Sequence, residues 1–124
     1  MSNQLLTKQY AAEAAIAANR IVKYGSTDDF VVQAAAVGDA MFGVVENVAP
    51  ALGERCDVVT HGIAEVKLGG TVVRGGALTS DATGQAVAAA PAAGVNNRVI
   101  GYARQSGVAG DVIEVLLALS TLQG

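Results

Sequence analysis

The stretch of sequence that decides the fold is Val99-Ile-Gly-Tyr-Ala-Arg-Gln-Ser-Gly-Val-Ala-Gly-Asp-Val-Ile-Glu-Val-Leu, because an earlier segment of the chain follows the same plan. That segment is Met41-Phe-Gly-Val-Val-Glu-Asn-Val-Ala-Pro-Ala-Leu-Gly-Glu-Arg-Cys-Asp-Val-Val. With one extra residue in the first loop, the aligned pairs are Gly43 with Gly101, Ala51 with Ala109, Gly53 with Gly110 and Val58 with Val115. Each segment has an apolar run, a loop that ends in glycine and an acidic residue, and an alternating run. This pattern predicts two related β-hairpins with loops of about five or six residues.

The alternation in the second strand of each hairpin predicts which side chains are buried. Neighbouring residues of a strand point to opposite faces. We therefore expect Asp57 and Glu114 to face water. The opposite, packed face should carry Cys56, Val58, Ile113, Val115, Leu117 and Leu119.

The composition favours strands over helices. Valine and isoleucine outnumber leucine by 23 to 9, and 15 residues are glycine, a balance typical of short strands joined by turns. Alanine supplies 24 of the apolar residues, so the core should be thin. At 124 residues the chain has the length of a single domain.

A small turn unit precedes each hairpin. The segments 22–32 and 78–87 both read as strand, turn and strand, and equivalent positions in the two halves are 55 to 58 residues apart. The repeats begin near Arg20 and Arg74. We therefore predict a mainly β fold, as one small β-barrel or a jelly-roll-like sandwich of two sheets, with eight to ten short strands and two related hairpin units.

The N-terminal segment, residues 1–19, is predicted to be an arm that precedes a β domain at residues 20–124. The part from Tyr10 to Asn19 is ambiguous, because its six alanines favour a short helix whereas the β-branched residues that follow favour an extended chain. The arm carries Leu5 and Leu6 without turn residues. We expect residues 2–10 to be mobile in the free protein, with Leu5, Leu6 and Tyr10 docking onto a neighbouring subunit.

No pattern of catalytic or ligand-binding residues is present in the sequence. His61 and Cys56 are five residues apart, an odd spacing that places them on opposite faces of a continuous strand. Cys56 is expected in the core and His61 in a structural or surface position. Adjacent Asp28 and Asp29 are best explained by a turn, and the glycine pairs lack the residues of a phosphate-binding loop. We expect no enzyme activity, no metal and no cofactor.

Charge and hydropathy limit the possible partners. The net charge is −3 and the eight basic residues are scattered, so nucleic acid is not an expected partner. The longest uncharged stretch, residues 82–97, is interrupted by glycine and proline, so no membrane contact is expected. With one cysteine and no signal-peptide pattern, the chain is expected to stay soluble in the cytoplasm where it is made.

The segment Gly75-Gly-Ala-Leu-Thr-Ser-Asp-Ala-Thr-Gly-Gln-Ala-Val followed by the glycine-containing hairpin that closes in Gly110-Asp resembles the capsid cement, or head decoration, proteins of tailed bacteriophages. The resemblance covers residues 11–119 approximately. It implies a non-enzymatic protein that binds the outer surface of the capsid as an oligomer and bridges major capsid protein subunits. It also implies synthesis in the host cytoplasm. Because thin β domains expose strand edges that a neighbour commonly covers, we expect a homotrimer or homodimer.

Two other classes of protein remain open from the residues. One is a small-molecule-binding β-barrel or an enzyme of unrecognised type, although the five Phe and Tyr residues are too spread out to suggest an aromatic-lined cavity. The other is a phage tail or fibre component.

Overall fold

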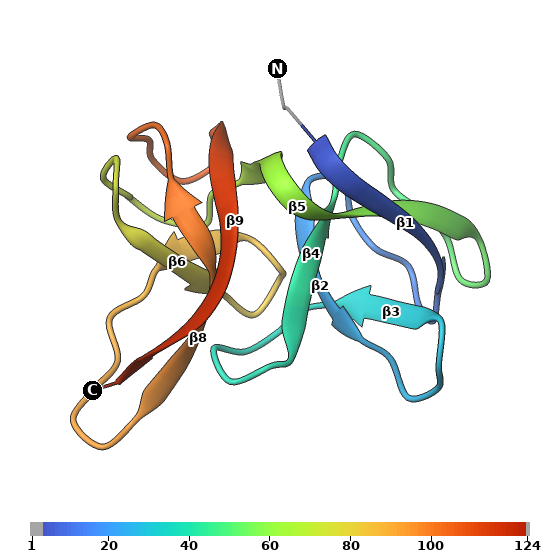
Figure 1. The fold of residues 1–124 in the computed structure, drawn as a ribbon, viewed down its shortest axis with the longest axis horizontal. Coiled ribbons are helices and arrows are strands. Elements are labelled where there is room, and N and C mark those ends of the chain that lie inside the picture. Colours follow the sequence, from blue (N-terminus) through green and yellow to red (C-terminus); the bar gives the residue numbers. More distant parts are fainter. Residues whose placement is uncertain (1–3, 124) are drawn as a thin grey trace.

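The computed structural model describes residues 4–123, and in that range the chain forms strands and turns but no helix (Figure 1). The mainly β fold is confirmed. The strands are β1 (Gln4–Ala12), β2 (Arg20–Tyr24), β3 (Phe30–Gln33), β4 (Met41–Val45), β5 (Arg55–Lys67), β6 (Ala77–Ser80), β7 (Ala86–Ala88), β8 (Asn96–Ala103) and β9 (Val112–Gln123).

Five strands close into a small barrel, which we call the first unit (residues 4–59). Their order is β1-β3-β2-β4-β5, and β1 also pairs with β5, so this sheet closes on itself. The β1–β5 pairing is antiparallel and runs from Thr7 opposite Val59 to Ala11 opposite Arg55. The barrel is one of the two architectures that the sequence left open.

Strand β5 continues into a second sheet, which we call the second unit (residues 63–123). The strand order there is β5-β9-β8-β6-β7, and a parallel bridge between Leu68 and Ala86 joins the two ends. Figure 1 shows the units beside each other, with β5 passing between them. Gly62 lies at this passage with φ 97°, a left-handed value that glycine adopts most readily.

The two predicted hairpins are β4–β5 and β8–β9, and one glycine has the same steric role in each. A Cβ atom on Gly43 would lie 2.5 Å from Val58 Cγ1. A Cβ atom on Gly101 would overlap the carbonyl oxygen of Leu116 and lie 3.0 Å from Val115 Cγ1. The predicted matches of Gly43 with Gly101 and of Val58 with Val115 are confirmed, because the neighbouring strand passes too close for any side chain.

An acidic side chain holds the loop of each hairpin. Glu54 Oε1 accepts a hydrogen bond from the N–H of Ala51 over 2.7 Å, and Asp111 Oδ2 accepts one from the N–H of Val108 over 3.0 Å. Ala51 is thus equivalent to Val108, and its predicted match with Ala109 is wrong. The extra residue of the first loop lies before Ala51.

The repeat begins earlier than the sequence indicates. Gly53 donates its N–H to the Ala12 carbonyl oxygen over 2.8 Å, and Gly110 donates to the Leu68 carbonyl oxygen over 2.8 Å. The two loop glycines match as predicted, with φ 84° and 94°. However, these bonds also make the end of β1 equivalent to the end of β5. The duplicated unit therefore starts at β1 and again at residue 63, before the predicted starts near Arg20 and Arg74.

The expectation that residues 2–10 stand apart from the domain is wrong for the described part, residues 4–10, because β1 is a strand of the first barrel. Of the ambiguous segment, Tyr10 to Ala12 are extended and residues 13–19 form bends and turns without a helix. Ile16 is buried in this stretch and donates its N–H to the Pro50 carbonyl oxygen over 3.0 Å. Residues 1–3 lie outside the described range.

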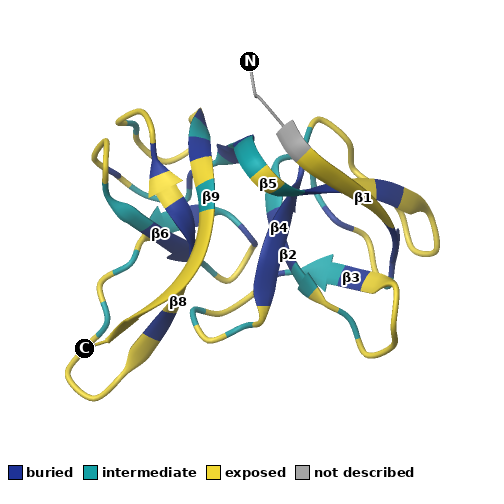
Figure 2. Cartoon of the chain, in the orientation of Figure 1, coloured by how far each residue is buried: buried dark blue, intermediate teal, exposed yellow. Residues whose placement is uncertain are grey.

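Each unit has buried strand segments, drawn in dark blue in Figure 2, and an apolar core. The two cores match position by position. The first core contains Tyr10, Ala12, Ile16, Val22, Val31, Phe42, Val45, Cys56 and Val58. Their counterparts in the second unit are, in the same order, Val66, Leu68, Val72, Leu78, Ala86, Ile100, Ala103, Ile113 and Val115. The second cluster also includes Ile21, Ala34, Met41, Val44, Val59 and Ala64, which pack where the units meet.

Candidate interaction surface

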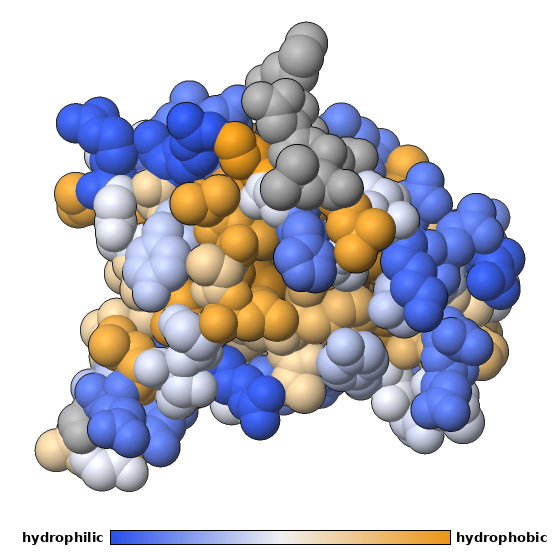
Figure 3. All heavy atoms as spheres, viewed as in Figure 1, coloured by the Kyte–Doolittle hydropathy of each residue, from blue (hydrophilic) through white to orange (hydrophobic). Residues whose placement is uncertain are grey.

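An apolar groove of about 400 Å³ lies between the first unit and β9. Figure 3 shows apolar side chains gathered over the middle of the face on which β1 and β9 lie. The residues that line the groove are Leu6, Lys8, Tyr10, Tyr24, Phe42, Thr60, His61, Leu117, Ala118 and Leu119. Its surface is mainly apolar, so it suits contact with an apolar surface of another protein better than capture of a charged ligand.

Two of the three predicted anchor residues line this groove. Leu6 is 51% exposed, as a docking residue requires. Tyr10 is only 8% exposed, because its ring packs edge-on against Phe42 with 5.2 Å between the ring centroids. Tyr10 is therefore first a core residue of the barrel, and its side chain also lines the groove. Leu5 lies in β1 by its backbone, and its side chain is outside the described part of the structure.

Tyr24 is the aromatic residue of this surface that sequence reasoning missed. Its ring stacks on Phe42 with 4.0 Å between centroids and 9° between planes, and its side chain is 56% exposed. Lys8 also lies on this surface, with Nζ 5.3 Å from the centroid of the Tyr10 ring. The exposed aromatic face and the ammonium group together form a platform that a partner could cover.

The groove wall formed by β9 departs from the predicted alternation. Ile113 and Val115 are buried as expected, but Leu117 is only partly buried and Leu119 is exposed. Strand β9 extends past the core of the second unit, so the apolar residues of its second half are exposed to solvent. The predicted packed face is therefore correct as far as Val115 and wrong for Leu119.

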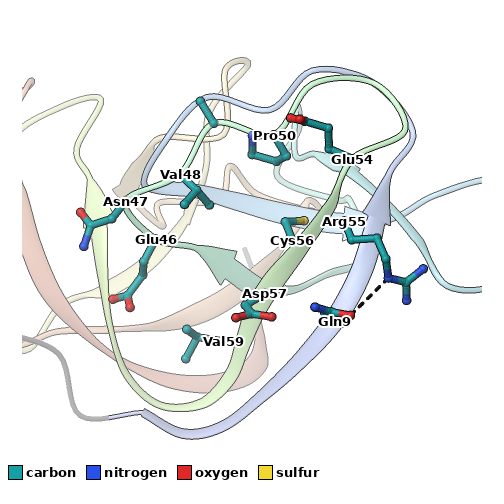
Figure 4. A pocket seen from close by; sticks show the side chains of 11 residues that line it. Gln9, Glu46, Asn47, Val48, Pro50, Glu54, Arg55, Cys56, Asp57 and Val59 are labelled. Atoms are coloured by element: carbon teal, nitrogen blue, oxygen red, sulfur yellow. Dashed lines mark hydrogen bonds between the residues drawn. The ribbon is translucent and has the colours of Figure 1, made fainter.

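A second hollow, of about 680 Å³, lies under the loop of residues 46–50 (Figure 4). Its polar side chains hold the local structure. Glu46 accepts a hydrogen bond from the Glu65 N–H, and Arg55 Nε donates to Gln9 Oε1 over 3.2 Å. These contacts join neighbouring segments of the chain and leave no arrangement of nucleophile, base and oxyanion donor among the side chains that line the hollow.

Cys56 and His61 lie in different hollows. Cys56 is buried in the wall of the second hollow, and this burial, followed by the nearby Asp57 carboxylate, raises the pKa of its thiol. His61 lines the apolar groove and has Nδ1 3.1 Å from Thr60 Oγ1. A protonated thiol away from the imidazole is a poor nucleophile.

Groups of three or more His, Cys, Asp or Glu side chains that could hold a metal ion do not occur within residues 4–123. The turn predicted at the two adjacent aspartates is present, and Asp29 has φ 67°. Over the same described range, the chain has no helix long and apolar enough to cross a membrane.

Comparison with known proteins shows similarity to one protein family and to solved structures. The model of the phage cement protein family matches residues 2–119. The head fibre gp8.5 N base of bacteriophage phi29 is similar in structure, with a TM-score of 0.65 and 21% sequence identity over 96% of this chain and 98% of that one. At this identity the structural similarity concerns the fold alone. No curated protein matches the sequence.

Proposed function

The chain belongs to the phage cement protein family, and on that basis we propose that it decorates the outer surface of a bacteriophage capsid and stabilises the shell by bridging neighbouring major capsid protein subunits. It is a phage structural protein with a mainly β fold. The observation that carries the proposal is the family match over residues 2–119. In this proposal the protein is made in the host cytoplasm, acts on the virion and performs no catalysis.

The part of the apolar groove around Leu6, which pairs with His61 of β5, is the surface that we assign to the capsid contact. Leu6 is exposed at its rim, and burying one leucine side chain contributes about 1.5–3 kcal/mol before the entropy of ordering is subtracted. Leu5 precedes it in β1, and Tyr10 supports the groove from the barrel core. Because β1 is already paired with β5, the anchor is presented by a rigid strand and loses little entropy on binding.

We also propose that the protein associates with itself as a homodimer or homotrimer. Large apolar side chains such as Tyr24, Leu116 and Leu119 are exposed on the isolated chain, and a neighbouring copy could cover some of them. Several weak capsid contacts in one oligomer would add through multivalency.

The proposal is tested by adding purified protein to phage shells that lack it and imaging the particles by cryo-electron microscopy. Wild-type protein should occupy regular positions on the outer surface. Leu6→Asp should lower occupancy at least tenfold at a concentration that half-saturates the wild type. Leu52→Asp is the matched control, because Leu52 is 72% exposed in the β4–β5 loop and does not line the groove. Removing residues 2–9 is less suitable, since it would delete most of β1.

Two results would contradict this assignment. If Leu6→Asp decorates shells as fully as Leu52→Asp, the capsid contact lies elsewhere on the protein. If wild-type protein is absent from the outer surface, decoration is not its function.

A second candidate function, the base of a fibre, is favoured by the similarity to the phi29 head fibre base. The same images distinguish the two functions. A decoration protein should give compact density flush with the shell, whereas a fibre base should carry density that extends outward from it.

A further inference from the structure

The two units meet through a row of apolar side chains on the first unit. Ile21 pairs with Val44 across β2 and β4, and Val44 pairs with Val59 across β4 and β5. All three are buried and belong to the core cluster of the second unit. We call this row the covered face.

The second unit receives the covered face through its β6–β7 turn and the second half of β5. The N–H of Ile21 donates to the Gly84 carbonyl oxygen over 2.9 Å, and Arg20 Nε donates to the Thr83 carbonyl oxygen over 3.0 Å. Ala64 of β5 is fully buried in the same cluster. Backbone bonds and apolar contacts therefore fix one unit against the other.

The second unit carries the same row of positions without a cover. Ala77 pairs with Tyr102 and Tyr102 pairs with Leu116, which repeats the pairing of the covered face strand by strand. Yet Tyr102 is 38% exposed and Leu116 is 47% exposed. We call this row the open face. It is the surface through which the first unit binds its neighbour, left unoccupied on the second.

The first unit carries the counterpart of the receiving surface. Lys8 lies opposite Val58 just as Ala64 lies opposite Val115, so Lys8 takes the place of Ala64. Lys8 is exposed, whereas Ala64 is buried. The open face has Tyr102 where the covered face has a valine, and an ammonium group beside a tyrosine ring is a favourable pair.

The β2–β3 turn takes the place of the β6–β7 turn in this counterpart. Its Asp28 and Asp29 are exposed, and Tyr24 at its start presents an aromatic surface. We call Lys8, Tyr24, Asp28 and Asp29 the receiving face. The β6–β7 turn of the second unit is covered by the first unit. Within the described chain, the β2–β3 turn is not covered by the other unit.

The turn of the receiving face and the residues that flank the open face carry charges of opposite sign. Asp28 and Asp29 give the turn of the receiving face a negative charge, while the exposed Arg74 and Arg104 lie next to the open face in sequence. Arg104 directly follows β8 at the position that Glu46 holds after β4. Contact between the faces would bring unlike charges together, which favours association and sets its orientation.

We propose that the open face of one copy binds the receiving face of a second copy, so that the packing between the two units of one chain is repeated between chains. The partner is therefore another molecule of this protein, bound head to tail. Such a contact joins different surfaces of the two copies, and repeating it closes a ring if the rotation allows. The inference rests on the self-association proposed above but not on capsid binding.

Sedimentation velocity of the purified full chain over a concentration series tests the contact. Leu116→Asp should raise the dissociation constant of the oligomer at least tenfold, and Leu52→Asp should leave it unchanged. Tyr102→Ala is a second, milder variant of the same face. Circular dichroism and a melting curve show that each variant is folded.

A charge exchange provides an independent test that does not disturb apolar packing. The double variant Asp28→Arg, Asp29→Arg should weaken association, and adding Arg74→Asp and Arg104→Asp in the same chain should restore it. If the apolar variants do not fold, this exchange alone decides the matter.

The possible outcomes separate the inference from the function. Oligomers that resist both sets of changes would overturn the proposed contact while leaving self-association intact. A wild-type protein that stays monomeric at all concentrations would overturn both. Decoration of shells is measured separately, so neither result depends on the capsid assay.

Discussion

Replacing Gly43 by alanine should destabilise the protein, because the added Cβ atom would clash with the neighbouring strand. A Cβ at this position would lie 2.5 Å from Val58 Cγ1 and 2.7 Å from the Val59 carbonyl oxygen. Non-bonded carbon atoms prefer a separation of about 3.5–4.0 Å, so β4 and β5 would have to move apart by about 1 Å. Val58 is fully buried and has little freedom to rotate away. Overpacking of this kind typically costs about 1–3 kcal/mol.

Gly38 provides the matched control. A Cβ at Gly38 would have nothing within 4 Å, and neither glycine has a positive φ. Gly38→Ala should therefore be neutral or stabilising by about 0.4–1 kcal/mol, because alanine lowers the entropy of the unfolded chain. The difference between the two variants isolates the steric clash from the entropic effect.

The assay is urea unfolding followed by far-ultraviolet circular dichroism, at a concentration where all variants have the same oligomeric state. Thermal unfolding should show Gly43→Ala melting below Gly38→Ala by several degrees, since about 1 kcal/mol corresponds to roughly 3–6 °C for a domain of this size. Gly101→Ala should be at least as destabilising, because its Cβ would meet the backbone oxygen of Leu116. Equal stability of Gly43→Ala and Gly38→Ala would refute the close-approach argument.

Three further outcomes are expected. Cys56→Ser should lower the free energy of unfolding by about 1–3 kcal/mol because it buries a hydroxyl, while His61→Ala, at an exposed site, should change it by less than about 0.5 kcal/mol; urea curves measure both. Hydrogen bonds from the Ser26 hydroxyl and N–H lower the pKa of Glu13. Ser26→Ala should raise that pKa in an NMR titration, and the stabilisation from this carboxylate, present above its unfolded pKa, should be lost as pH falls through the lowered value. Asp81→Ala should cost about 1–3 kcal/mol by thermal unfolding, because Asp81 Oδ1 accepts hydrogen bonds across the β6–β7 turn.

The hairpins could be predicted from the sequence because the neighbouring strand leaves no room for a side chain at Gly43 or at Gly101. Only glycine fits there, so the same residue recurs in both hairpins. The start of the repeat has no such recurring residue. Lys8 and Ala64 are equivalent, as are Tyr10 and Val66, yet neither pair shares a residue type. What those positions share is backbone hydrogen bonding, which many side chains allow.

The candidate surface was predicted only in part for a related reason. Leu5 and Leu6 in an otherwise polar segment indicate exposed apolar side chains, and the structure has Leu6 exposed. Tyr10 follows the same polar segment and was predicted to be exposed as well, but its ring packs against Phe42 in the core. Tyr24 gave no signal, because its role depends on stacking against the same Phe42 on another strand. Contacts between distant strands set both outcomes.

Strand β5 gives the protein a constant span. It passes through Gly62 from the first unit to the second, and Asn19 Nδ2 donates to the Glu65 carbonyl oxygen over 3.1 Å just beyond that point. Lys67 donates its N–H to the Asn19 carbonyl oxygen over 3.0 Å, so the joint is braced on both sides. Because the two units are fixed relative to each other, the surfaces that they present stay at a constant distance. On a lattice whose subunit spacing changes, such a protein would bind most strongly at the spacing that matches its own length. Its binding would therefore favour that spacing over others.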